Sequence, residues 1–152
     1  MKAEAKLKEM GLELPAVSPA VGSYVRSVRS GNMLFLAGHG PYRDGKCAYI
    51  GKLGQEYGVP EGYEASKLVA LNCLATVKEA LGDLDRVRRV VKVLGLVSSS
   101  PGFVEQPQVI NGCSDLLVEL YGEAGRHARA AIGVAELPGG MPVEIEMVLE
   151  VE

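Results

Sequence analysis

Hydrophobic and polar residues alternate with a period of two in two runs near the end of the chain, within residues 127–152. This period is typical of β-strands, because successive side chains of a strand point to opposite faces. The second run has an apolar face and an acidic face, formed by Val143, Ile145, Met147, Leu149 and Val151 and by Glu144, Glu146 and Glu150, respectively. A Leu-Pro-Gly-Gly segment separates the two runs, and we therefore predict a β-hairpin.

The first run places an arginine on a face of small residues, which consists of Arg129, Ala131, Gly133 and Ala135. An arginine beside alanine and glycine has open space around it, as a binding pocket needs. In a hairpin its guanidinium would lie near the carboxylate of Glu144, and the pair could hold a substrate carboxylate and orient or deprotonate a water molecule. A surface Arg–Glu pair across two strands is the alternative, and the pattern alone favours it.

A period of about 3.6 residues predicts two helices, over residues 63–81 and 107–121. Gly82 ends the first helix, and a proline is acceptable in the first turn of the second. Asn111 lies roughly 100° around the second helix from Ile110, which places it at an edge of the buried stripe. The apolar stripes comprise Ala70, Cys73, Leu74, Val77 and Leu81 in the first helix and Val109, Ile110, Cys113, Leu116, Leu117 and Leu120 in the second.

The remaining segments predict further strands around these helices. Residues 24–30 and the MLFLAG segment form another hairpin through a Gly31-Asn32 turn, and residues 86–99 form a β-branched, buried central strand. The glycine- and proline-rich segment 40–62 is irregular, with a short strand near residues 46–50. The resulting order of strands and helices predicts an α+β fold in which both helices cover one face of a mixed sheet.

Composition and charge narrow the functional classes. The 152 residues suffice for one domain, 1–152, in which residues 1–20 form an extension whose short amphipathic helix ends at Gly11 and Pro15. A net charge of −3 offers no general attraction to nucleic acid or to an anionic membrane. No apolar run approaches the roughly 20 residues of a membrane span, and the first residues lack the apolar part of a signal peptide, so we expect a cytoplasmic protein.

Cysteine and histidine usage predicts neither a disulfide framework nor a metal site. The three cysteines, Cys47, Cys73 and Cys113, are odd in number and lie far apart in the sequence. Cys73 and Cys113 fall on the helical stripes, which indicates buried, reduced thiols. The two histidines, His39 and His127, have no cluster of cysteines or acidic residues around them that would complete a zinc site.

Three segments in this order resemble the Rid/YjgF family, the reactive-intermediate imine deaminases that are also known as L-PSP endoribonucleases. The segments are GSYVRSVRSGNMLFLAGHGP at residues 22–41, VINGCSDLLVELYG at residues 109–122 and HARAAIGVAELPGGMPVEIEMV at residues 127–148. The step of 15 residues from Arg129 to Glu144 fits the family without a gap. The resemblance covers nearly the whole chain from about residue 21.

The resemblance implies a chorismate-mutase-like α+β fold and a homotrimer with three clefts between subunits. It implies hydrolysis of enamine or imine intermediates, such as 2-aminoacrylate, to 2-keto acids and ammonia, without a metal or an organic cofactor. The expected partner is then a small imine or keto acid that carries a carboxylate, with no nucleic acid and no membrane involved.

The resemblance also implies roles for individual residues. Arg129 holds the substrate carboxylate, and Glu144 positions or activates the attacking water. The remaining contacts fall to Tyr24 at the cleft wall, to the supporting Asn111, and to backbone groups of Gly38 and Ala131.

Four positions depart from the family pattern and are typical of a distinct branch. Ala37 and His39 replace the usual serine and glutamine, His127 stands at a usual proline, and Ala131 occupies a common cysteine position. His39 either lines the cleft as a base or hydrogen-bond donor, or caps backbone groups as a loop histidine. His127 is expected at the start of a strand beside the cleft.

These departures motivate a second function, a non-catalytic trimer that binds a small carboxylate metabolite and regulates a partner. RNA cleavage is a third function and ranks last. The basic run at residues 86–92 lacks interleaved aromatic residues and is typical of a solvated strand start, and the sequence offers no paired-histidine site for general acid–base catalysis.

Overall fold

The computed structural model of the protein describes residues 2–152, so Met1, which the predicted N-terminal helix includes, lies outside the described residues. The elements follow one another as α1 (Lys2–Glu9), β1 (Ser27–Ser30), β2 (Met33–Leu36), β3 (Tyr42–Arg43), β4 (Lys46–Cys47), α2 (Val59–Leu81), η1 (Leu84–Arg86), β5 (Val87–Ser98), α3 (Gln106–Tyr121), η2 (Gly122–Gly125), β6 (Ala128–Val134), η3 (Pro138–Gly140) and β7 (Val143–Val151).

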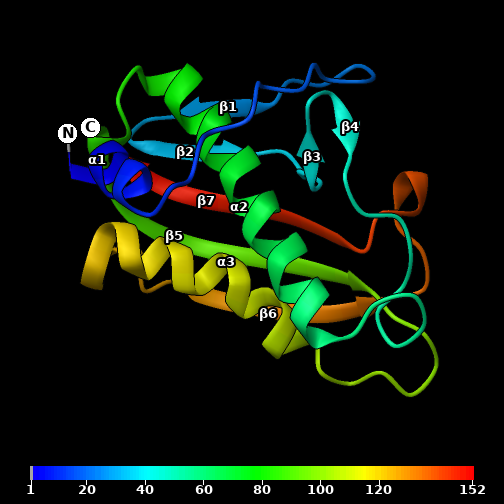
Figure 1. Cartoon of the computed structure of the whole chain (residues 1–152). Helices are drawn as coiled ribbons and strands as arrows, with labels where there is room; N and C mark the ends of the chain where they lie inside the picture. Colours follow the sequence, from blue (N-terminus) through cyan, green and yellow to red (C-terminus); the bar gives the residue numbers. More distant parts are fainter. Residues whose placement is uncertain (1) are drawn as a thin grey trace.

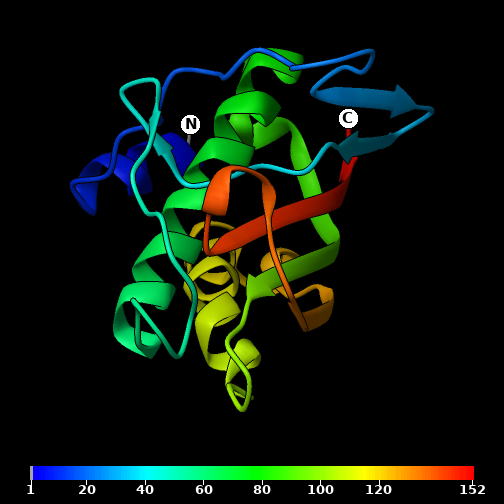
Figure 2. The same cartoon turned by 90° about the vertical axis from the view of Figure 1, so that its right-hand side faces the viewer.

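The main sheet of the described residues has five strands in the order β1-β2-β7-β5-β6. Strands β5 and β6 run parallel, whereas the other neighbours pair antiparallel. Helices α2 and α3 lie side by side across one face of this sheet (Figure 1), and no α-helix of residues 2–152 covers the other face (Figure 2). The predicted α+β fold, with its helices on one face of a mixed sheet, is confirmed.

The predicted hairpin between the last two strands is wrong. Strand β5 lies between β6 and β7 and pairs with both of them. The chain passes from β5 through α3 into β6, which forms a parallel β–α–β unit, and returns past η3 to the far side of β5. Parallel neighbours need such a crossover, and the long, β-branched β5 supplies two edges for pairing. The other predicted hairpin, β1–β2, forms with Ser27 opposite Leu36.

The apolar residues that alternate along β7 lie at the centre of the core. The predicted apolar face of this strand is fully buried, and the acidic face is half-buried or exposed. Strand β5 is a central strand as predicted, and its Gly95 leaves room for Ile110 of α3 against the sheet. The buried stripes of α2 and α3 meet these strands, so a single apolar layer fills the space between helices and sheet.

Helix α2 begins at Val59, four residues before the predicted start. Gly58 is its N-cap, and the Glu61 carboxylate accepts a hydrogen bond from the Gly58 N–H at 3.0 Å. Pro60 lies in the first turn, where its missing N–H costs no helical hydrogen bond. Helix α2 ends as predicted at Gly82, whose left-handed φ of 82° glycine adopts without strain.

The predicted N-terminal helix forms as α1 and packs against α3 and η1. The Asp85 carboxylate accepts hydrogen bonds from the backbone N–H groups of Lys2 at 2.6 Å and Ala3 at 2.9 Å, so a negative charge faces the first turn of the helix. Glu4 forms an ion pair with Lys78 of α2. None of the helices in residues 2–152 is long and apolar enough to cross a membrane.

The three cysteines are free thiols, and Cys73 and Cys113 are fully buried, as predicted. Burial raises the pKa of Cys113 to about 12, and it also raises the pKa of Cys73. Cys47 is half-buried in β4, and burial raises its thiol pKa as well. These thiols are therefore protonated near neutral pH and are weak nucleophiles.

Helices α2 and α3 cross at Gly112, whose substitution provides a test of the packing. A Cβ atom at this position would overlap the Tyr63 carbonyl oxygen and lie 2.9 Å from the Tyr63 carbonyl carbon. We expect Gly112→Ala to lower the free energy of unfolding by about 2 kcal/mol, because backbone cannot yield as a flexible side chain can. Urea titration measures the effect. Gln108→Ala, on the exposed side of the same helix, should stay within about 0.5 kcal/mol of wild type.

Candidate functional site

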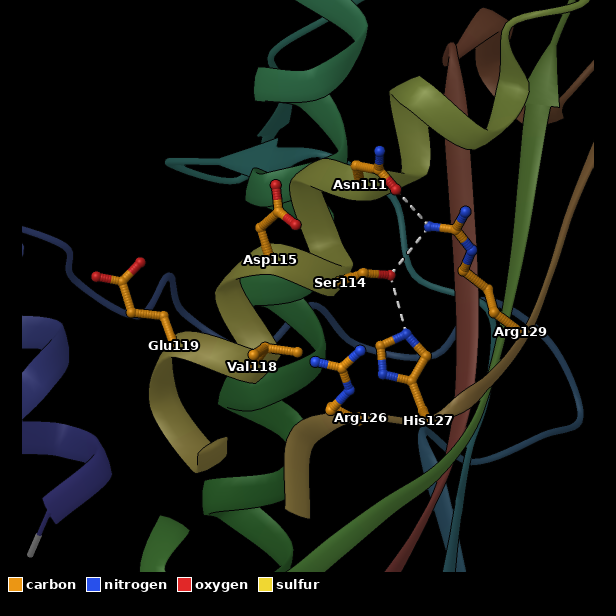
Figure 3. A pocket seen from close by; sticks show the side chains of 8 residues that line it. All are labelled: Asn111, Ser114, Asp115, Val118, Glu119, Arg126, His127 and Arg129. Carbon is orange, nitrogen blue, oxygen red and sulfur yellow. Dashed lines mark hydrogen bonds between the residues drawn. The ribbon is translucent and has the colours of Figure 1, made fainter. Parts of the chain in front are cut away.

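A cleft of about 500 Å³ lies between α3 and the edge strand β6 (Figure 3). Helix α3 and the residues that lead into β6 form its two walls. The lining side chains are Asn111, Ser114, Asp115, Val118, Glu119, Arg126, His127 and Arg129. The cleft therefore combines basic side chains on the strand wall with polar and acidic ones on the helix wall.

Arg129 is half-buried in this cleft and fixed by two side chains of α3. Its Nη1 donates hydrogen bonds to Asn111 Oδ1 at 2.8 Å and to Ser114 Oγ at 3.2 Å (Figure 3). Asn111 and Ser114 are three residues apart and thus share one helix face, and Asn111 lies at the edge of the buried stripe, as predicted. Within residues 2–152 the other guanidinium nitrogens make no hydrogen bond, so they can bind a ligand carboxylate.

The small residues beside Arg129 do not form the cleft. Ala131 packs against the core, and it is not among the cleft-lining residues. A Cβ atom at Gly133 would lie 2.7 Å from Gln106 Nε2, so a side chain of α3 occupies the space that the pattern left open there. The cleft opens instead toward Arg126 and His127, which precede β6.

A second cleft of about 760 Å³ contains three other predicted residues, Tyr24, Gly38 and Glu144. It lies between the segment before β1, the end of β2 and the η3 turn. A Cβ atom at Gly38 would overlap Glu144 Oε2, so this glycine allows the carboxylate to lie across the chain after β2. Tyr24 is 47% exposed at the cleft wall. Ala37 also lines this cleft, at a position where a serine would offer a hydroxyl group.

Neighbouring charges act on the Glu144 carboxylate in opposite directions. Burial and the nearby Glu146 raise the pKa of Glu144, while the Arg26 guanidinium lowers it. Arg26 lines the same cleft, and its buried Nε has no hydrogen-bond partner among the described residues. Sequence reasoning missed Arg26, although it lies two residues after Tyr24 and therefore on the same side of an extended chain. A raised pKa makes this carboxylate a stronger base toward a proton from water than an ordinary glutamate.

Within one chain, Arg129 and Glu144 lie on opposite faces of the sheet. Arg129 stands beside Val93 of β5, whose buried side chain faces the helices. Glu144 alternates with Val143 and Ile145, which face the helices, so its side chain is on the uncovered face. The sequence hypothesis of an Arg–Glu pair on one hairpin is therefore wrong for a single chain.

His39 lies in the core rather than in either cleft. Its side chain is 2% exposed, and its backbone pairs with Ile145 of β7. Nδ1 donates to the Ala37 carbonyl oxygen at 2.6 Å, and Nε2 accepts from the Thr76 hydroxyl at 2.8 Å. Burial, reinforced by the charge of Arg26, lowers the pKa of His39 to about 4, so the ring is neutral near pH 7. Of the two sequence interpretations, the backbone-capping histidine describes this geometry.

Sequence reasoning also missed the pair formed by Ser114 and His127. Ser114 Oγ lies 2.9 Å from His127 Nε2, and His127 Nδ1 lies 2.7 Å from the Gly125 carbonyl oxygen. A helical wheel that starts from Asn111 would have found Ser114, because a step of three residues stays on one face. No local pattern links Ser114 to His127, since the η2 turn brings them together.

The family model for YjgF/chorismate mutase-like proteins, described as candidate endoribonucleases, matches residues 4–144. The chain belongs to this family. Protein TCP17 from Trypanosoma cruzi is 45% identical over 147 residues, which cover 96% of this chain and 92% of TCP17. TCP17 is thus a relative of this YjgF-family chain over almost its whole length.

Solved structures agree with this membership. Atu1372 from Agrobacterium tumefaciens is 46% identical, with a TM-score of 0.93 and coverage of 99% of this chain and 92% of Atu1372. RidA from the Antarctic bacterium Psychrobacter is 26% identical, with a TM-score of 0.62 and coverage of 91% and 96%, respectively. The YjgF-family chain therefore shares its fold with RidA and is much closer to Atu1372, which fits a distinct branch of the family.

Proposed function

We propose that this protein hydrolyses small enamine or imine intermediates that carry a carboxylate, of the 2-aminoacrylate type, to 2-keto acids and ammonia. The observation that carries the proposal is Arg129, whose half-buried guanidinium is oriented by two acceptors and keeps donors for a ligand. A fixed guanidinium binds a planar carboxylate through two parallel hydrogen bonds. Membership in the family that includes RidA supports the same reaction.

A site that uses both Arg129 and Glu144 requires two subunits, because the residues lie on opposite faces of one sheet. The proposed assembly is a homotrimer in which each cleft takes Arg129 and Asn111 from one subunit and Tyr24, Gly38 and Glu144 from its neighbour. The uncovered sheet face supports this assembly. It exposes the apolar side chains of Val28, Phe35 and Ile132, which would be buried by another copy of the chain.

The trimer predicts a specific effect of a charge on this face. Ile132 is 47% exposed on β6, and Ile132→Glu would place an unpaired charge in the proposed interface. We expect light scattering to show a trimer for wild type and monomers for this variant. Ala80→Glu, on the exposed side of α2, serves as the control and should remain trimeric. A wild-type protein that is monomeric at micromolar concentration would contradict the shared site.

In the proposed reaction Arg129 holds the substrate carboxylate and so fixes the position of the adjacent C=N carbon. Glu144 accepts a proton from a water molecule as its oxygen adds to this carbon of the protonated imine, which gives a neutral carbinolamine. Glu144 then returns the proton to the amino nitrogen. As the C–N bond breaks and the C=O bond forms, Glu144 accepts the hydroxyl proton, and ammonia and a keto acid leave. This last proton passes to ammonia or to solvent, which restores the carboxylate. The raised pKa of Glu144 suits these proton transfers, and fixing one water next to the imine replaces a bimolecular encounter.

A coupled assay tests this function. A dehydratase or an amino-acid oxidase generates the imine in situ, and keto-acid formation is followed with and without the protein. We expect acceleration that depends on Arg129. A folded trimer that accelerates none of these reactions would contradict the proposal for these substrates.

The second candidate is a non-catalytic trimer that binds a small carboxylate and regulates a partner. One observation favours it, namely that Ala37 gives the Glu144 cleft no hydroxyl at the position of the usual serine. Keto-acid binding without turnover would support this function, and turnover that requires Arg129 would exclude it. RNA cleavage has less support, because the two histidines lie apart, one in the core and one in the Arg129 cleft.

A further inference from the structure

Arg129, Ser114 and His127 form a continuous hydrogen-bonded chain (Figure 3). Arg129 Nη1 lies 3.2 Å from Ser114 Oγ, which lies 2.9 Å from His127 Nε2. We propose that His127, acting through Ser114, is a positioning residue that fixes the Arg129 guanidinium for carboxylate binding. This inference rests on the proposed function only for the identity of the ligand, since the ordering of Arg129 is a property of the protein alone.

The carbonyl group of Gly125 determines the donor and the acceptor in each hydrogen bond that links His127, Ser114 and Arg129. Its carbonyl oxygen can only accept, so His127 Nδ1 carries a proton and Nε2 of the neutral ring is an acceptor. The Ser114 hydroxyl therefore donates to Nε2, and its lone pairs remain free to accept from Arg129. Donation by the hydroxyl makes its oxygen a better acceptor, so the two bonds strengthen each other. Without His127, the hydroxyl would be free to rotate.

The backbone holds the His127 end of these linked hydrogen bonds in place. A Cβ atom at Gly125 would overlap the Leu117 carbonyl oxygen and lie 2.9 Å from Val118 Cα, so the η2 turn is pressed directly onto α3. This contact sets the distance between His127 and the helix that carries Ser114. A glycine at this position is thus required for the close approach of the turn to the helix.

Burial favours the neutral form of His127. The cationic Arg129 and Arg126 line the cleft from the strand side, and Asp115 and Glu119 line it from α3. Burial lowers the pKa of His127, and Arg129 lowers it further, whereas the hydrogen bond to Gly125 raises it. The resulting pKa lies below the ordinary value, which keeps Nε2 available as an acceptor near neutral pH.

The hydrogen bonds to Nη1 determine which edge of the Arg129 guanidinium is available to a ligand. Nη1 has two N–H groups, and the acceptors Asn111 and Ser114 engage both of them. A planar guanidinium held at two points cannot rotate about its Nε–Cζ bond without breaking both bonds. The edge formed by Nε and Nη2 then presents two parallel donors, and this geometry fits a single carboxylate. We infer that the substrate carboxylate binds at this edge.

Arginine-side-chain ¹⁵N NMR of the full-length protein at neutral pH tests the proposal without any ligand. The measured quantity is the rotation rate of the Arg129 guanidinium, assigned by the loss of its signals in Arg129→Lys. We expect His127→Leu and Ser114→Ala each to accelerate rotation at least about tenfold. The double variant should rotate no faster than Ser114→Ala alone, because the two residues act in series.

Two further variants distinguish the effect of the His127–Ser114–Arg129 hydrogen bonds from general effects on the cleft. His127→Gln retains an acceptor oxygen and should keep rotation close to the wild-type rate. Arg126→Gln removes a charge from the same cleft but leaves the hydrogen bonds between His127, Ser114 and Arg129 intact. It should not change the rotation rate of the Arg129 guanidinium. In the coupled assay, His127→Leu should raise KM with little change in kcat, since a carboxylate clamp acts equally on the ground state and the transition state.

Two results would overturn the proposal. One is a folded His127→Leu variant whose Arg129 rotates as slowly as in wild type. The other needs no variant, namely imidazole ¹⁵N shifts of the wild-type protein that place the His127 proton on Nε2 instead of Nδ1. Pyruvate titration separates the proposed function from this inference. Slow rotation of Arg129 without pyruvate binding would reject the carboxylate ligand and leave the positioning role of His127 supported.

Discussion

Replacement of Arg129 with alanine is expected to lower kcat/KM for carboxylate-bearing imines by about 100- to 1,000-fold, because the substrate carboxylate would enter a half-buried cleft without its cationic partner. The same change frees Asn111 and Ser114 from their shared donor, but these groups border the open cleft and water can replace it. The protein should therefore fold and assemble normally. The coupled imine assay measures the loss, and thermal unfolding measures the stability.

Matched variants test whether the loss of activity comes from the parallel N–H donors of the Arg129 guanidinium. Arg129→Lys keeps the charge and loses the parallel donors, and it should recover only a small part of the activity. Arg126→Ala removes the exposed arginine of the same cleft and should cost less than about tenfold. If Arg129→Ala and Arg126→Ala reduced activity equally, the cleft would act through its overall charge, and the proposed carboxylate clamp would be wrong.

The elements of the fold follow from local patterns. Alternation along β7 predicts its buried face correctly, and the helical stripes predict α2 and α3 to within a few residues. The start of α2 was missed because Gly58 and Pro60, residues typical of loops, serve here as the N-cap and as a residue of the first turn. Local sequence therefore predicts which side chains share a face, and it predicts element boundaries less well.

Pairing between distant segments could not be predicted from the same patterns. A Pro-Gly-Gly turn between two alternating runs is typical of a hairpin, yet β5 separates β6 from β7. The pairing of β5 with two partners depends on the whole sheet, because a buried central strand needs hydrogen-bond partners for the backbone groups on both of its edges. This one difference in order moves Arg129 and Glu144 to opposite faces and changes a single-chain site into one that needs two copies.

The residues that line each cleft also depend on contacts between distant segments, which local sequence patterns do not predict. Asn111 and Arg129 meet as the family resemblance implies, while Tyr24, Gly38 and Glu144 gather in another cleft of the chain. His39 is a core residue, because the polar Thr76 on the inner side of α2 gives its ring a buried partner. The contact of His127 with Ser114 depends on the η2 turn and on the missing side chain of Gly125, which the sequence does not reveal without the fold.

Replacement of Glu144 with glutamine should lower kcat on the order of 1,000-fold and leave KM nearly unchanged, because the amide cannot accept a proton from water. In wild type the active form is the carboxylate, so kcat should fall as the pH drops through the Glu144 pKa. Burial and Glu146 raise this pKa, which moves the acid limb of the profile upward from that of an ordinary glutamate. Glu144→Gln should have no such limb.

Glu146 provides the matched control for this experiment, since it is an exposed glutamate two residues along the same face of β7. Glu146→Gln removes a neighbouring negative charge, so it should lower the pKa of Glu144 and shift the acid limb to lower pH while kcat at neutral pH stays close to wild type. If Glu146→Gln abolished turnover and Glu144→Gln did not, the base would be Glu146. The cleft that contains Tyr24, Gly38 and Glu144 would then not be the neighbour's half of the active site.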